Sequence, residues 1–144
     1  DCPFHAVNNI LTNISKQTNI IIVDLHCEAT SEKVAMGWHL DGQVSCVFGS
    51  HTHIQTADET ILPKGTAYIT DVGMCGPYDS VIGRRTDRVL SAFITGMPAP
   101  FDVAKNDIRL CGIIVTIDSK TGKTLRIKRI QEKFTPPADL SEGE

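Results

Sequence analysis

The chain opens with apolar side chains at helical spacing. Between residues 3 and 16 they recur every three or four positions, at Phe4, Val7, Ile10, Leu11 and Ile14. Asparagine and lysine fill the positions between them, and Pro3 suits the first turn of a helix. The spacing predicts an amphipathic helix over residues 3–16 that packs on a sheet.

Two apolar runs follow and predict strands. Residues 19–26 form a continuous β-branched run, typical of a strand buried on both faces of a parallel sheet. Residues 44–48 form the second run, and a helix is predicted between the two. Thr30 or Ser31 can cap this helix, and Asp41-Gly42 marks its end. Its apolar side is predicted to consist of Val34, Ala35 and Trp38.

Strand, helix and strand in about thirty residues are typical of a βαβ unit, whose crossover is right-handed and whose strands are parallel. After it the pattern changes to hairpins. Residues 60–62 and 66–70 flank the turn Pro63-Lys64-Gly65, and residues 110–118 and 124–130 flank a second turn. Residues 87–95 are predicted to be a helix that begins at Thr86 or Asp87. The fold class is therefore α/β, with one βαβ unit followed by hairpins.

The composition is that of one globular domain. Of 144 residues, 41% are apolar and 22% are charged, so we expect a domain over residues 1–134 and a polar tail over 135–144. The net charge of −3 gives no electrostatic footprint for sequence-independent binding to nucleic acid or to anionic membranes. We expect neither a membrane nor a sequence-specific nucleic acid as partner. No apolar run approaches the length of a membrane span, so we expect a soluble protein.

Five cysteines, an odd number, are widely spaced without a C-x-x-C pair. This pattern argues against a disulfide framework and favours a reducing compartment, so we expect the cytoplasm. The chain begins Asp1-Cys2-Pro3, without an initiator methionine. We therefore expect a fragment or a processed product.

Three histidines follow the two predicted parallel strands. His26 ends the first strand, and His51 and His53 come directly after the second. The carboxyl ends of parallel strands meet at one edge of a sheet, where open α/β sheets place their ligands. In extended backbone His51 and His53 point the same way, which suits a metal ion. The alternative is a chance pair of histidines on a polar loop.

Three blocks of sequence carry a resemblance to a known family. They are VDLHxEATSEK at residues 23–33, GSHTHxQTAD at residues 49–58 and TDVGMxG at residues 70–76. In this order they resemble the YmdB-like bacterial phosphodiesterases, a group within the calcineurin-like metallophosphoesterases. The resemblance covers nearly the whole chain and is weakest in the tail.

The resemblance implies a four-layer α/β/β/α sandwich with two divalent metal ions, of iron, manganese or zinc, at the strand ends. Carried over by motif, His26 and His51 bind one ion and His53 binds the other. Such a site activates a water for attack on phosphorus, and the implied activity is a phosphodiesterase on cyclic nucleotides of the 2′,3′ type.

The motifs that the superfamily carries in the first half of its domain are missing from this sequence. The superfamily's Asp-containing block, its bridging carboxylate and its Asn-His pair, which supplies the general acid, have no counterpart in the 144 residues. We therefore expect the C-terminal half of such an enzyme, with little activity alone, that pairs with the missing N-terminal half or forms a homo-oligomer. The alternative is a non-catalytic fragment or interaction module without a complete metal site.

Further residues near the histidines have two interpretations each. Asp24 orients an imidazole or ends a strand, and Glu28 reaches the site or pairs with Lys33. Thr30 and Ser31 cap a helix or bind phosphate. The segment from Asp71 to Gly76 is either a tight loop or a loop that borders the substrate, through Asp71, Gly73, Met74 and Gly76. His5 and His39 are assigned to the surface or to packing.

Overall fold

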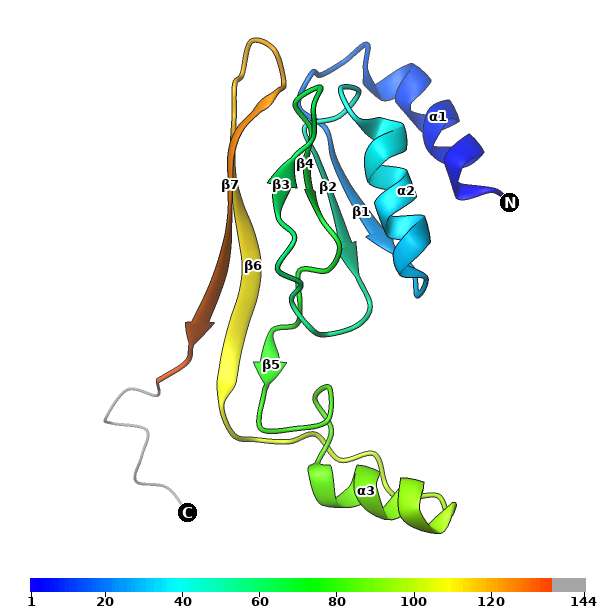
Figure 1. Cartoon of the computed structure of the whole chain (residues 1–144), viewed down its shortest axis with the longest axis vertical. Helices are drawn as coiled ribbons and strands as arrows, with labels where there is room; N and C mark the ends of the chain where they lie inside the picture. The colour runs from blue at the N-terminus through cyan, green and yellow to red at the C-terminus, as the bar shows by residue number, and fades with distance from the viewer. Residues whose placement is uncertain (136–144) are drawn as a thin grey trace. The chain divides into compact units, whose positions relative to one another are not determined.

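The computed structural model describes residues 1–135, so residues 136–144 of the predicted tail lie outside the described residues. The described part contains three helices and seven strands (Figure 1). Their bounds are α1 Pro3–Ile14, β1 Ile22–His26, α2 Thr30–Leu40, β2 Cys46–Ser50, β3 Thr60–Ile61, β4 Ala67–Ile69, β5 Gly76–Pro77, α3 Thr86–Thr95, β6 Ile108–Ile117 and β7 Thr124–Lys133. The protein is therefore a mixed α/β fold, as predicted.

The chain forms two compact units. The first contains residues 1–73 and 112–129, and the second contains, of the described residues, 74–111 and 130–135. Strands β6 and β7 each contribute residues to both units. Within residues 1–135 no helix has the length and apolar character that a membrane crossing needs.

The first unit is built on a four-stranded sheet with the order β1-β2-β4-β3. Strands β1 and β2 are parallel, with Ile22 opposite Cys46 and His26 opposite Ser50. Strand β4 is parallel to β2 and antiparallel to β3. The predicted βαβ unit and the predicted first hairpin are both confirmed.

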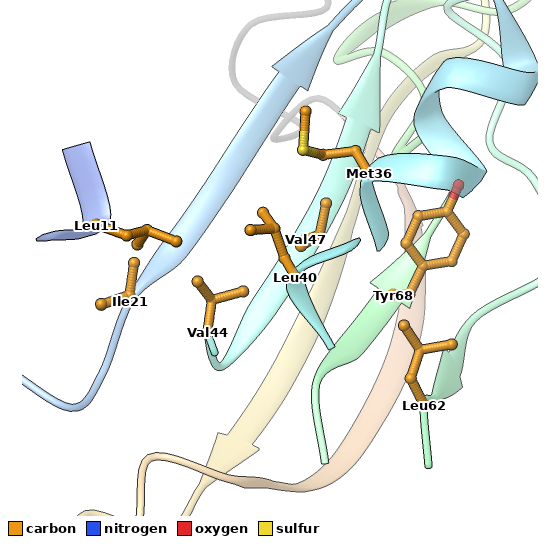
Figure 2. Packing of buried hydrophobic residues seen from close by; sticks show 8 residues of the cluster. All are labelled: Leu11, Ile21, Met36, Leu40, Val44, Val47, Leu62 and Tyr68. Atoms are coloured by element: carbon orange, nitrogen blue, oxygen red, sulfur yellow. The ribbon is translucent and has the colours of Figure 1, made fainter. Parts of the chain in front are cut away.

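The core of this unit lies between helix α2 and one face of the sheet. Figure 2 shows Met36 and Leu40 of the helix beside Val47 and Tyr68 of the strands. Leu40 is fully buried and Val47 is 1% exposed. Helix α1 adds one buried residue, Leu11, to the same cluster. The hydrophobic core therefore fixes α2 against the strands whose ends carry the histidines.

The buried face of α2 differs from the predicted one. Its buried residues are Lys33, Met36, Gly37 and Leu40, which follow the i, i+3, i+4, i+7 spacing of one helix face. The predicted apolar side is exposed, and Trp38 of that side is 57% exposed. The pattern misled because the buried face includes a lysine and a glycine. A Cβ on Gly37 would lie 2.5 Å from Tyr68 Cδ2, so the glycine lets the tyrosine ring pack under the helix.

Two further expectations are wrong. Helix α2 has Ala29 at its N-cap without a side-chain capping hydrogen bond, so neither Thr30 nor Ser31 caps it. Strand β1 is not buried on both faces, because it lies at the edge of the sheet and its side chains alternate between exposed and half-buried. Ile22 is 54% exposed.

The second unit contains β5, which pairs antiparallel with β6 through Gly76 and Arg109, and helix α3 at the predicted position. Helix α3 buries Val89 and ends at Gly96 in a left-handed conformation. The predicted second hairpin is confirmed as β6 and β7, which are longer than the sequence pattern indicated.

Candidate functional site

The site begins where β1 and β2 end side by side. Their parallel register places His26 opposite Ser50, so the next residue, His51, reaches the imidazole of His26. The His51 Nδ1 atom lies 3.2 Å from His26 Nε2. The two rings meet edge to face, with their centroids 5.0 Å apart. Two of the three predicted histidines therefore converge at this edge of the sheet.

Asp24 and Ser50 orient the ring of His26 from its other side. The Ser50 hydroxyl donates to Asp24 Oδ1 at 3.1 Å. Because its proton is used there, Ser50 Oγ accepts a hydrogen bond from His26 Nδ1, also at 3.1 Å. This network assigns the proton of neutral His26 to Nδ1 and leaves the Nε2 lone pair directed at His51. Asp24 thus acts on the imidazole through Ser50 and not by direct contact.

The backbone after β2 is not extended. His51 has φ 125° and His53 has φ 64°, both in the left-handed region that non-glycine residues rarely adopt. The extended backbone assumed for residues 51–53 is therefore wrong, since the strand ends at Ser50, and the strand period gives no ground for placing the two histidines on one side. Both imidazoles belong to exposed residues. Non-glycine residues with positive φ concentrate at functional sites, where the surrounding structure holds them.

The geometry of His26 and His51 fits two ligands of one cation. A tetrahedral zinc ion with bonds of about 2.0–2.1 Å separates two nitrogen ligands by about 3.3 Å, close to the observed 3.2 Å. Among residues 1–135 there is no group of three or more His, Cys, Asp or Glu side chains arranged to hold a metal ion. The described chain therefore supplies two converging nitrogen donors, and further donors are needed to complete a metal site.

The remaining predicted residues divide into three groups. Glu28, Thr30 and Ser31 lie on the exposed surface at the start of α2. Glu28 does not pair with Lys33, because the Lys33 ammonium binds Asp71 Oδ2 at 2.9 Å. Asp71 and Gly73 form the second group, which lies in the segment after β4. Met74 and Gly76 belong to the second unit.

Asp71 is fully buried, and its carboxylate accepts hydrogen bonds from two backbone N–H groups. Its Oδ2 atom accepts from Thr52 N–H and its Oδ1 atom accepts from Gly73 N–H, both at 2.9 Å. Burial raises the pKa of Asp71, but hydrogen bonds from Thr52, Lys33 and Gly73 outweigh it and hold the pKa below its usual value. Asp71 is therefore a charged anchor for the loop between the two histidines.

Sequence reasoning missed Ser50 and Lys33. Ser50 had a usable signal, because in a parallel register the residue before His51 lies opposite His26. Lys33 had none on its own, since a lysine in a helix is ordinarily solvated. Burial raises the pKa of the nearby Cys27 thiol, which favours the protonated form over the nucleophilic thiolate.

Comparison with known proteins gives concordant matches. The model of the family described as YmdB-like protein matches residues 1–130. The 2′,3′-cyclic-nucleotide 2′-phosphodiesterase of Bacillus subtilis (strain 168) is 48% identical over 130 residues, which are 90% of this chain and 49% of that protein. The chain thus spans about half the length of this relative.

Two crystal structures share the fold. A hypothetical protein from Thermus thermophilus matches with a TM-score of 0.85 and 40% identity, over 92% of this chain and 51% of that one. A novel phosphatase from Mycoplasma pneumoniae matches with a TM-score of 0.84 and 39% identity, over 91% of this chain and 46% of that one. Sequence and structure therefore agree that the chain belongs to the YmdB-like protein family.

Proposed function

We propose that this chain supplies the histidine ligands of a dinuclear metal site in a phosphodiesterase that hydrolyses cyclic nucleotides of the 2′,3′ type. The proposal rests chiefly on one observation: His51 Nδ1 and His26 Nε2 lie 3.2 Å apart, while the proton of His26 is held on the opposite nitrogen. The name of the Bacillus subtilis relative, 48% identical, supports the reaction class and the substrate.

In this proposal His26 and His51 hold one divalent ion of iron, manganese or zinc, and His53 contributes to a second. Bound ions of this kind neutralise phosphate charge and activate a water for attack on phosphorus. Ser50 and Asp24 keep the imidazole of His26 in the tautomer that presents Nε2. The exposed position of the histidines leaves them accessible to a phosphoester.

The proposal requires donors beyond those that the described residues bring together. The chain covers 49% of the Bacillus subtilis relative and 46% of the Mycoplasma pneumoniae phosphatase, which leaves room for a segment that carries the bridging carboxylate and the general acid. Strand β1 offers a place for it, because β1 lies at the edge of the sheet and its Ile22 is 54% exposed. We propose that this segment, or a second copy of the chain, completes a four-layer sandwich.

The proposed location is the cytoplasm. All five cysteines are free thiols within the described residues, which is the usual state in a reducing compartment.

Calorimetric titration with Zn²⁺ and Mn²⁺, combined with a 2′,3′-cyclic AMP assay, tests the proposal. His51→Ala is expected to weaken metal binding at least about tenfold, because one of two converging donors is lost. The matched control is His39→Ala, since His39 Nε2 contacts Asn8 Oδ1 at 2.9 Å on α1, away from the strand ends.

Metal affinity is expected to stay unchanged in His39→Ala. Equal effects of the two substitutions would contradict the ligand assignment. The chain alone is expected to show little hydrolysis, and a version extended to the length of the relatives is expected to show robust hydrolysis. An extended protein that binds no metal and cleaves nothing would instead support the non-catalytic module.

A further inference from the structure

A buried ion pair lies directly beneath the turn that carries His51 and His53. The Lys33 ammonium contacts Asp71 Oδ2 at 2.9 Å, and the two side chains are 1% and 0% exposed. Buried charges are costly and are ordinarily found only where they are paired and hydrogen-bonded. Lysine is among the residues least often fully buried, so its presence on the core face of α2 calls for a specific cause.

The same carboxylate holds the turn. Asp71 Oδ2 also accepts the N–H of Thr52 at 2.9 Å, and Thr52 is the residue between the two histidines. Its Oδ1 atom accepts the N–H of Gly73 at 2.9 Å. One buried side chain therefore ties together α2, the segment after β2 and the segment after β4.

The turn needs such an anchor because its backbone is strained. His51 and His53 have φ of 125° and 64°, and residues in such conformations persist only where surrounding contacts hold them. Thr52 reinforces the turn, since its hydroxyl donates to Ile54 O at 3.1 Å and accepts from Ile54 N–H at 3.2 Å.

Gly49 of β2 makes room for the side chain of Lys33. A Cβ on Gly49 would lie 2.8 Å from Lys33 Cδ and 1.9 Å from Thr70 O. Only glycine at this position lets the lysine stem cross the strand and reach Asp71. Gly49 of β2, Lys33 of α2 and Asp71 of the segment after β4 thus form a single arrangement.

We infer that the buried Lys33–Asp71 pair is a positioning device that holds the strained turn of residues 51–53 in its ligand-presenting conformation. The expected loss of metal affinity rests on the proposed metal-binding function, because a relaxed turn moves the imidazole of His51 away from His26. The structural part of the inference, the anchoring of Thr52 N–H by Asp71, is independent of that function.

Two variants test the inference. The double variant Lys33→Met/Asp71→Leu replaces both charges by apolar side chains of similar size, an exchange that buried ion pairs often tolerate. Asp71→Asn keeps the shape and one acceptor oxygen. The matched control is Asp41→Asn, because Asp41 is also a buried carboxylate that accepts backbone N–H groups, from Lys64 and Thr66, beside the turn between β3 and β4.

Amide hydrogen exchange of the metal-free protein gives the first readout. Thr52 is expected to exchange at least about tenfold faster in the double variant than in the wild type, while the amides of the core strands keep their protection. The second readout is the Zn²⁺ dissociation constant, expected to rise about 10- to 100-fold in both Asp71 variants and to stay unchanged in Asp41→Asn.

Unchanged Thr52 exchange in the double variant would overturn the inference. Equal loss of zinc affinity in Asp71→Asn and Asp41→Asn would also overturn it, because the effect would then be general destabilisation. A wild-type protein extended to the length of the relatives that binds no zinc would defeat the proposed function, and the exchange of Thr52 would then decide the positioning role alone.

Discussion

Ser50 is the residue that turns two neighbouring strand ends into an oriented pair of imidazoles. Its hydroxyl lies between Asp24 Oδ1 and His26 Nδ1, at 3.1 Å from each. Without this link His26 is free to adopt the other tautomer and to donate toward His51. The candidate site therefore depends on a serine as much as on the histidines themselves.

Gly49 is the residue whose replacement is expected to be most disruptive next to the site. A Cβ there would lie 1.9 Å from the carbonyl oxygen of Thr70, and backbone cannot move aside cheaply. Gly49→Ala is expected to lower the free energy of unfolding by at least about 2 kcal/mol in urea denaturation. Gly76→Ala is the control, because its Cβ would meet only Met74 Sδ at 3.9 Å, and a cost of at most about 0.5 kcal/mol is expected. Similar costs for the two substitutions would contradict the close approach of the Gly49 backbone to the carbonyl oxygen of Thr70.

Asp58 is expected to make stability depend on pH. Burial raises the pKa of its carboxyl, but hydrogen bonds from Thr56 and Thr70 outweigh burial and hold the pKa below its usual value. A carboxyl with a lowered pKa in the folded state stabilises the protein above its unfolded pKa, and this contribution is lost as the pH falls through the folded value.

In Asp58→Asn the free energy of unfolding is therefore expected to change less steeply between about pH 5 and pH 2 than in the wild type. Urea denaturation at several pH values measures the slope. Identical slopes in the two proteins would contradict the assigned hydrogen bonds.

Helix α2 shows at the scale of an element how far sequence reasoning extends. Its bounds were predictable from the strand–helix–strand spacing and from Asp41-Gly42, but its buried face was not. That face contains Lys33 and Gly37, and both are there because of partners distant in sequence, Asp71 and Tyr68. A single-sequence pattern carries no information about such partners, so it favoured the apolar residues on the opposite side.

Substitutions on the two faces of α2 test this assignment. Leu40 is fully buried, whereas Trp38 is 57% exposed. Leu40→Ala is expected to cost about 2–5 kcal/mol of unfolding free energy, through lost burial and a cavity. Trp38→Ala is expected to cost at most about 1 kcal/mol, despite removing the larger side chain. A larger cost at Trp38 would restore the face predicted from the sequence.

The site as a whole was only partly predictable. The parallel strands indicated that His26 and His51 lie at the same sheet edge, because the βαβ unit fixes the direction of β1 and β2; their register, with His26 opposite Ser50, comes from the structure. The turn after Ser50 was not predictable, because its positive φ values occur at His51 and His53 and not at glycines, which would have indicated them. These φ values also depend on the buried Asp71. The resemblance to the family supplied the expected chemistry, which periodicity alone did not.

At the scale of the whole molecule, the chain combines an ordered sheet with an incomplete set of donors. It covers 49% of the Bacillus subtilis relative, and its described residues contain no cluster of three or more His, Cys, Asp or Glu side chains arranged for a metal ion. Strand β1, at the sheet edge, carries both Asp24 and His26. The fold therefore brings two imidazoles together at the end of an edge strand, and this edge is where we propose that a further chain segment pairs.

The ring nitrogens that bind a metal ion are the most direct test of the proposed site. Long-range ¹H–¹⁵N NMR of the histidine side chains, recorded while Zn²⁺ is added to the chain, identifies them. We predict that metal-free His26 carries its proton on Nδ1, and that zinc shifts the resonances of His26 Nε2 and His51 Nδ1 while those of His39 stay in place. A His26 proton on Nε2, or zinc-induced shifts that spare both His26 and His51, would contradict the assignment.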